Sequence, residues 1–369
     1  MSNTGQRIGT ANLPLHYGKA PRWLFERMVK LAREIIIVTV EEFGAEELLH
    51  RFADPFWFQA LGCVLGFDWH SSGVTTTVCG AVKEGIKGIE KELNFFVAGG
   101  KGKTSRKTPS EIEGCAHLLK VDPSPLVYAS RMSAKVDNTA LQDGYQLYQH
   151  TFFFTKEGLW AVVQQGMNKT NRYARRYHWV SDKVSNFVCE PESAICSQSK
   201  ANVLNLVALE SAEARNTITS IASEEKTEKI ISQLNKLKTL NLPQRHYISP
   251  DDICPDRLKK NFLSIYEHKP KDFESLLALK NIGPKTLRAL SLISELIYDI
   301  PVSLRDPASY SFAHGGKDGF PYPVDRNVYD SSTQFLVQTV EKIRIGDKEK
   351  LNALRRLSAL NKSGIHIPT

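Results

Sequence analysis

Hydrophobic residues in the amino-terminal part of the chain recur with helical spacing. From Trp23 to Ile35 they stand three and four residues apart behind Pro21, which predicts an amphipathic helix that begins with proline. A second helix is expected over Ala45 to Arg51, and Val74 to Leu93 repeats the pattern after turn-forming residues. We therefore expect this part of the chain to be mostly helical.

The middle of the chain has the pattern of β-strands. The stretches Tyr145 to Thr155 and Leu159 to Gln165 are rich in Phe, Val and Trp, and Lys156-Glu157-Gly158 between them has the composition of a turn. These features predict an antiparallel β-hairpin, which we expect to be followed by short strands up to about Val207.

Helical spacing returns in the carboxy-terminal part. Residues 211–240 are rich in Glu, Lys, Ser and Ile, and residues 250–361 have helical patterns around one Gly- and Pro-rich loop. The fold class expected is α+β, with a mixed α/β domain that contains an antiparallel sheet and a helical domain after it. The expected divisions are a catalytic domain over 1–207, a helical connector over 208–249 and a helical DNA-binding domain over 250–369.

The charge of the chain favours a polyanionic partner. Lys and Arg total 48 against 40 Asp and Glu, so the formal net charge is +8 and the isoelectric point is about 9.0. Two stretches, 93–110 and 158–181, contain no acidic residue. The candidate phosphate contacts in them are Lys101, Lys103, Arg106, Lys107, Lys169, Arg172, Arg175 and Arg176.

Aromatic residues alternate with the arginines of the second stretch. In the run from Arg172 to Trp179, Tyr173, Tyr177 and His178 stand among the guanidinium groups. This composition suits a surface that neutralises phosphates and stacks bases. It equally suits a strand whose rings pack inward.

Neither a membrane span nor a secretion signal is expected. The apolar run from Ile35 to Val38 is far shorter than the roughly 20 residues that a membrane span needs, and residues 1–18 lack the apolar core of a signal peptide. The six cysteines include no Cys-x-x-Cys pair, which argues against a zinc ribbon and a disulfide scaffold. We therefore expect a cytoplasmic protein without a membrane partner.

Residues 276–290 carry the most specific local motif. Their sequence, LLALKNIGPKTLRAL, resembles the helix-hairpin-helix motif of DNA repair proteins, with Asn281 in place of that motif's first glycine. The resemblance implies a short hairpin whose backbone N–H groups bind a DNA phosphate at the start of the second helix. The DNA contacts that it assigns are Asn281, Gly283, Lys285, Thr286 and Arg288. The alternative is an ordinary helical hairpin.

Residues 323–330 look like the segment that carries the catalytic aspartate of helix-hairpin-helix DNA glycosylases. The resemblance implies a metal-free site at Asp325, with His314 nearby, that breaks a glycosidic bond. A glycine-rich insertion at 314–319 lengthens the interval from the hairpin, and no lysine occupies the slot just after Thr286 that bifunctional members use. The alternative is that Asp325 caps the final helices.

Acidic and polar residues before and within the β-hairpin form the other candidate site. Hydrolysis of a phosphodiester needs acidic oxygens that hold one or two divalent cations, and a basic group near the nucleophile. We expect Mg or Mn to be held by Asp68, Asp137 and Asp143. The residues expected to assist are His70, Lys135 and Gln164.

The layout of this candidate site is similar to that of restriction-type nucleases. Those enzymes have a lysine two residues after the metal-binding carboxylate or Gln, whereas Gly166 stands in that position here. Each acid also has a structural alternative, since Asp68 and Asp143 could cap a helix or begin a turn. Taken together, however, the polar residues within an otherwise apolar hairpin indicate a polar site on the sheet, because unpaired buried amides cost free energy.

Segments spread over nearly the whole chain resemble one family. They are LPLHYGKAPRWLFERM, LGFDWHSSGVTTTV, GGKGKTSRKTP, KVDNTALQDGYQLYQH, WAVVQQGMN and HGGKDGFPYPVDRNVYD. They are similar to a family of archaeal and bacterial proteins catalogued as a domain of unknown function. The resemblance implies no activity.

The leading hypothesis from the sequence is a DNA-processing enzyme of DNA repair or recombination, a metal-dependent nuclease. Its expected partner is branched, single-stranded or damaged duplex DNA, with RNA and a homodimer left open. The rival hypotheses are a helix-hairpin-helix DNA glycosylase that uses Asp325 and a nucleic-acid-binding protein without catalysis.

Overall fold

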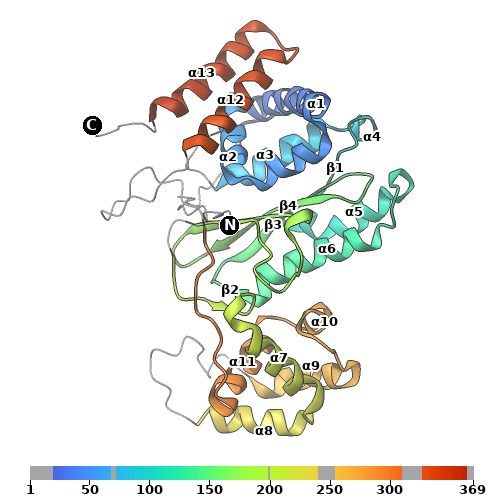
Figure 1. The fold of residues 1–369 in the computed structure, drawn as a ribbon, viewed down its shortest axis with the longest axis vertical. Coiled ribbons are helices and arrows are strands. Elements are labelled where there is room, and N and C mark those ends of the chain that lie inside the picture. Colours follow the sequence, from blue (N-terminus) through green and yellow to red (C-terminus); the bar gives the residue numbers. More distant parts are fainter. Residues whose placement is uncertain (1–19, 68–71, 198–199, 240–253, 310–325, 364–369) are drawn as a thin grey trace, which may run out of the picture.

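An antiparallel sheet lies between layers of helices in the computed structural model (Figure 1). The structure describes residues 20–67, 72–197, 200–239, 254–309 and 326–363. The five strands of the main sheet run in the order β1-β3-β4-β5-β6. Their bounds are β1 (Phe96–Lys101), β3 (Gln146–Phe154), β4 (Trp160–Asn168), β5 (Tyr173–Val180) and β6 (Ala194–Cys196). A two-stranded sheet pairs β2 (Leu141–Gln142) with β7 (Leu204–Asn205).

The predicted β-hairpin is confirmed as β3 and β4. Phe154 pairs with Trp160 across the turn, and the Thr155 N–H donates to the Leu159 carbonyl (3.0 Å). Gly158 in this turn has a φ of +89°, a conformation that favours glycine. The turn therefore sets the register in which the two apolar strands pair.

Both faces of the main sheet are covered. Successive side chains of a strand point to opposite faces, so Phe153 packs with the first helices of the chain whereas Phe152 packs with α6 on the other side. Sheet residues that would face water in a one-sided sheet are therefore buried here.

The first helical layer contains both ends of the described chain. It is formed by α1 (Arg22–Ala53), α2 (Pro55–Val64), α3 (Gly73–Gly85), α4 (Glu90–Leu93), α12 (Arg326–Lys342) and α13 (Asp347–Ser363). The two helices predicted before Arg51 form a single element that breaks at Gly44, where φ is +87°. The helix predicted from Val74 to Leu93 is interrupted in the same way at Gly88, whose φ is +82°.

The second layer covers the opposite face of the sheet. It consists of α5 (Thr108–Gly114) and α6 (Ser124–Lys135), and α6 continues into the π-helix η3 (Val136–Ala140). Short 3-10 helices complete the connections, namely η1 (Gly102–Lys107), η2 (Ala116–Leu118), η4 (Ser181–Lys183) and η5 (Leu209–Ser211).

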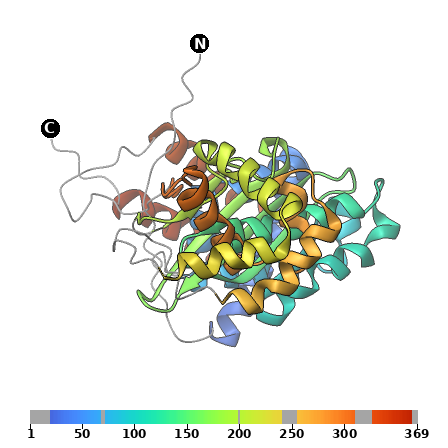
Figure 2. The same ribbon diagram turned by 90° about the horizontal axis from the view of Figure 1, so that it is seen from below.

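A helical unit adjoins the second layer (Figures 1 and 2). Its helices are α7 (Ala212–Glu224), α8 (Thr227–Leu237), α9 (Pro255–His268), α10 (Phe273–Ala278) and α11 (Pro284–Tyr298). Because α7 and α8 pack against α9 and α11, the described part of the predicted connector over 208–249 belongs to this helical unit.

The last two helices leave the helical unit and return to the first layer. The Phe335 ring lies 6.4 Å from that of Trp57, and Lys342 forms an ion pair with Glu42 (2.7 Å). The Arg356 Nε donates to the Val64 carbonyl (2.9 Å). The described helices after residue 250 therefore do not pack together as the single helical domain that the sequence predicted.

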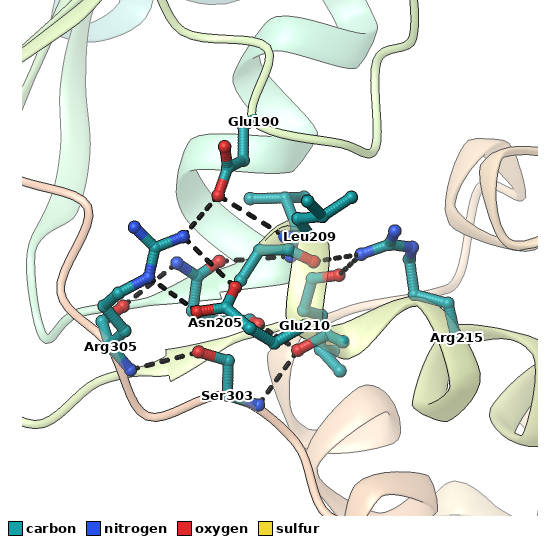
Figure 3. Close-up of polar contacts among 11 residues, drawn as sticks. Glu190, Asn205, Leu209, Glu210, Arg215, Ser303 and Arg305 are labelled. Carbon is teal, nitrogen blue, oxygen red and sulfur yellow. Dashed lines mark hydrogen bonds and ion pairs between the residues drawn. The ribbon is translucent and has the colours of Figure 1, made fainter. Parts of the chain in front are cut away.

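A strap of residues 300–308 joins α11 to the two-stranded sheet (Figure 3). Asn205 bridges to Ser303, and its Nδ2 donates to the Arg305 carbonyl (3.0 Å). The Arg305 guanidinium forms ion pairs with Glu190 and with Glu210 (2.9 Å). The helical unit is thus fastened to the sheet at its carboxy-terminal end.

The α+β class expected from the sequence is confirmed. Within the described ranges, no helix is both long and apolar enough to cross a membrane.

Candidate nucleic-acid interface

Strand register brings the two acid-free basic segments to one end of the main sheet. Lys101 at the end of β1 pairs with Gln149, and Asn168 at the end of β4 pairs with Tyr173 at the start of β5. The first of these basic segments continues from β1 into η1, and the second forms the turn from β4 to β5. We call the exposed cations of both the basic sheet end: Lys101, Lys103, Arg106, Lys107, Lys169 and Arg172.

The cations contributed by the first segment are accessible. Among the described residues, Lys101, Lys103, Arg106 and Lys107 are exposed and form no ion pair. The Lys101 ammonium lies 5.9 Å from the centre of the Tyr148 ring, which is within the range of a cation–π contact. These side chains are therefore positioned to meet an anion.

Glycines shape the chain at this end of the sheet. Gly99 has a φ of +87°, and a Cβ there would stand 2.3 Å from the His150 carbonyl oxygen. Gly102, with a φ of +62°, turns the chain from β1 into η1. The glycine-rich sequence of this segment thus permits close pairing with β3 and a sharp exit from the sheet.

Arg175, a predicted DNA contact, is buried on the face of the main sheet that α6 covers. Its side chain is 1% exposed and forms ion pairs with Asp143 (3.0 Å) and Asp306 (2.8 Å). Its guanidinium also lies 4.7 Å from the centre of the Tyr145 ring. The prediction is wrong for Arg175, because this residue joins β5 to the strap and does not reach the surface.

Arg176, the next residue, is buried on the opposite face of the sheet. It is 0% exposed, and its guanidinium donates to Gln59 Oε1 (3.0 Å) and to His178 Nε2 (2.9 Å). It lies 4.7 Å from the centre of the Phe58 ring. The DNA contact predicted for Arg176 is therefore wrong as well, since neighbouring strand residues enter opposite covered faces.

Asp143 does not fit a metal site. Its Oδ1 accepts from the Tyr145 N–H (3.0 Å), and its Oδ2 accepts from the Tyr177 hydroxyl (2.7 Å) and from Arg175. Both carboxylate oxygens are thus used within the protein. Asp143 is a partner of a buried cation, and the metal role predicted for it is not supported.

Asp137 belongs to a different network. Its Oδ2 accepts from Trp179 Nε1 (2.9 Å) and from Gln164 Nε2. Burial raises the pKa of Asp137 well above its ordinary value, and the neighbouring Glu192 carboxyl raises it further. The raised pKa favours a protonated carboxyl within this buried pair.

The described residues therefore do not assemble the predicted Mg or Mn site. In the ranges that the structure describes, no three His, Cys, Asp or Glu side chains form a group that could hold a metal ion. Asp68 and His70, the other members of the predicted site, lie outside the described residues. The same is true of His314 and Asp325, the predicted glycosylase residues.

Gln164 takes part in a buried chain of hydrogen bonds. Its Oε1 lies 2.8 Å from His150 Nδ1, and the other ring nitrogen of His150 lies 2.9 Å from Ser130 Oγ. Burial lowers the pKa of His150 to about 4, so its ring is neutral at pH 7. With Gln164 Nε2 donating to the Ser133 carbonyl (3.0 Å) and to Asp137, these hydrogen bonds satisfy the side chains of Gln164 and His150 inside the apolar hairpin.

Lys135 holds the hairpin between α10 and α11. Its Nζ donates to the carbonyls of Leu277 (2.6 Å) and Leu279. Burial lowers the pKa of Lys135 to about 8. These contacts make it a structural anchor, whereas the sequence predicted a role beside a nucleophile.

The hairpin between α10 and α11 exposes part of the predicted DNA contacts. Asn281 and Lys285 are exposed, and the Cβ position of Gly283 is open. Thr286, another predicted DNA contact, does not fit that role, because its side chain is buried and accepts from Asn261 Nδ2 (3.0 Å) and its N–H donates to the Gly283 carbonyl (3.0 Å). Arg288 is half-buried and donates to Gln142 Oε1 (3.0 Å). The family relationship of this motif stays a prediction.

Sequence reasoning missed Glu192 and Asp306, the partners of Asp137 and Arg175. No local pattern marks either residue, because each partner is distant in the sequence. The contact between Arg175 and Asp306 spans 131 residues. The one signal in the sequence is a cation, Arg175, within a β-strand pattern, since a cation is almost never fully buried unless it is paired.

Comparisons with known proteins give a family without a function. No curated protein matches the chain, and no solved structure matches it. The model of the family described as "Protein of unknown function (DUF763)" matches residues 9–324. Since this match covers most of the chain, the protein belongs to the DUF763 family.

Proposed function

We propose that the protein binds DNA, with the basic sheet end and the hairpin between α10 and α11 in contact with the phosphate backbone. The observation that carries the proposal is the meeting of two basic segments, distant in sequence, at one end of the sheet. Exposed cations of one sign, gathered in this way, supply the sequence-independent part of nucleic-acid affinity.

The hairpin supports DNA as the nucleic acid. Its loop connects α10 to α11, and Lys280, Asn281 and Lys285 are exposed along it. This arrangement is similar to the helix-hairpin-helix motif that the sequence suggested, in which a loop binds a phosphate of DNA. RNA is the competing ligand in the test.

Hydrolysis through Asp137 and Asp143 is not part of the proposal. Asp137 interacts with Glu192, and Asp143 with Arg175, so neither carboxylate is available at the surface. A nuclease or glycosylase activity would need groups outside these two networks.

The first test measures DNA affinity against salt. Fluorescence anisotropy with a labelled duplex is expected to give a logarithm of the association constant that falls linearly with the logarithm of salt concentration, by about 0.9 per phosphate neutralised. The double variant Lys103→Glu, Lys107→Glu should bind at least about tenfold more weakly than the unaltered protein. The matched control is Lys183→Glu, an exposed charge in η4 at the opposite end of the sheet.

Equal affinity of the double variant and the control would contradict the proposal, as would preference for RNA of the same length. The same mixtures, incubated with Mn or with EDTA and then with alkali, report cleavage. Metal-dependent breaks or alkali-dependent breaks would add an enzymatic activity to the binding function.

A further inference from the structure

We infer that the α10–α11 hairpin and the basic sheet end form one continuous surface for a single DNA duplex, and that Lys135 is a positioning residue for that surface. The inference rests on the proposed DNA binding. Two groups of cations fixed in one body can engage the same ligand together, because the second contact is then intramolecular.

Residues 135–142, from the last residue of α6 to β2, hold the hairpin on both sides of its loop. Lys135 donates to the carbonyls of Leu277 (2.6 Å) and Leu279, which lie at the end of α10. Gln142 Nε2 donates to the Pro284 carbonyl at the start of α11 (2.9 Å). The residues before and after the loop are therefore fixed to the same short segment of chain.

That segment also contacts the sheet end. Asn138, within η3, accepts from the Leu147 N–H through its Oδ1 (3.2 Å). Leu147 lies at the start of β3, two residues before the partner of Lys101. Residues 135–142 thus contact the hairpin on one side and the start of β3, at the basic end of the sheet, on the other.

A second fastening prevents the helical unit from swinging on this contact. After α11, Ser303 donates its N–H to Ser211 Oγ (2.9 Å), and Arg305 pairs with Glu190 and Glu210, as Figure 3 shows. Farther along the strap, Asp306 is held by the buried Arg175. The helical unit that contains the hairpin is therefore attached to the rest of the protein at two places, through residues 135–142 and through the strap.

The chemistry of this surface fits duplex DNA. Lys280 and Lys285 flank the hairpin loop, and four exposed cations stand in β1 and η1. A duplex is stiff over about 50 nm and presents phosphates at regular intervals. Cations held in a fixed relation can meet such a ligand at several phosphates without ordering it first.

Stoichiometry and paired substitutions test the continuous surface. Titration with a duplex of about 24 base pairs should saturate at one duplex per chain. Lys280→Glu with Lys285→Glu, and separately Lys103→Glu with Lys107→Glu, should each weaken that same binding event by about tenfold and reduce its salt dependence. Saturation at two duplexes per chain, with each pair of substitutions removing one of them, would overturn the inference and leave the proposed function standing.

Lys135→Met tests the positioning role. In this background the substitutions at Lys280 and Lys285 should cost less than about threefold in affinity, because the hairpin no longer holds its place. Lys135→Arg should restore the full effect, and Lys183→Met serves as the charge-matched control. An undiminished effect of the hairpin substitutions in Lys135→Met would overturn the positioning role.

A second variant and the affinity of the unaltered protein keep the inference testable. If Lys135→Met does not fold, as judged by circular dichroism, Gln142→Ala takes its place, since Gln142 holds the opposite side of the loop. Failure of the unaltered protein to bind any DNA would overturn the proposed function and this inference with it.

Discussion

The arginines of one short segment differ in exposure between the end of the main sheet and its interior. Arg172 lies in the turn before β5, with a φ of +60°, and is exposed. Arg175 and Arg176 lie within β5 and are 1% and 0% exposed. A basic run in a sequence therefore does not identify a binding surface until the position of each residue in the strand is known.

The two buried arginines also differ from each other in how they are stabilised. Arg175 meets two carboxylates, whereas the contacts of Arg176 include the neutral acceptors Gln59 and His178. Burial lowers the pKa of Arg176. A buried ion loses several kcal/mol of solvation. Removing the partners of either arginine should therefore destabilise the protein more than removing a partner of an exposed cation.

The largest effect is expected from Arg175→Met. The substitution leaves the carboxylates of Asp143 and Asp306 buried without their cation, which should lower the free energy of unfolding by about 3–5 kcal/mol. Urea denaturation measures it, and Arg172→Met is the matched control, expected to change stability by less than about 0.5 kcal/mol. Equal stability of the two variants would show that the burial of Arg175 has no structural role.

The next largest effect tests whether Asp137 acts as a protonated carboxyl or as a metal ligand. Asp137→Asn keeps an acceptor for Trp179 and supplies a donor for Glu192, so it should change stability by less than about 1 kcal/mol at pH 8. Asp137→Ala removes both and should cost about 3 kcal/mol. A large loss of stability in the Asn variant, measured by urea denaturation, would contradict the protonated carboxyl.

The pH dependence of stability tests the buried hydrogen-bond chain. Because burial lowers the pKa of His150 to about 4, the unfolded chain binds a proton between pH 6.5 and 4 that the folded protein does not. Stability contributed by neutral His150 should therefore be present above pH 6.5 and decline by about 3 kcal/mol as the pH falls to 4. The difference between the unaltered protein and His150→Gln, measured across this range, isolates the effect from other titrating groups.

The smallest effect on stability is expected at the basic sheet end. Lys101→Gln should leave the melting temperature unchanged, because the side chain is exposed and forms no ion pair among the described residues. It should lower the salt dependence of DNA binding by about one phosphate contact. A fall in stability without a change in DNA affinity would reverse the contrast between the two regions.

Local patterns determined much of the secondary structure. The strands β3 and β4 follow from runs rich in Phe, Val and Trp on either side of a glycine-containing turn, and α10 and α11 follow from helical spacing on both sides of Gly283. The basic segment of β1 and η1 was also recognisable from composition. These features depend on residues close together in the chain, so the sequence expresses them directly.

Only the tertiary structure decided which of the candidate residues reach the surface. Whether Arg175 is exposed depends on Asp306 and on the helices that cover each face of the sheet, all distant in sequence. The return of α12 and α13 to the first layer likewise depends on contacts such as that of Phe335 with Trp57. Strand geometry determines that neighbouring side chains point to opposite faces of the sheet. Only the helical layers packed on the sheet determine whether either face meets water.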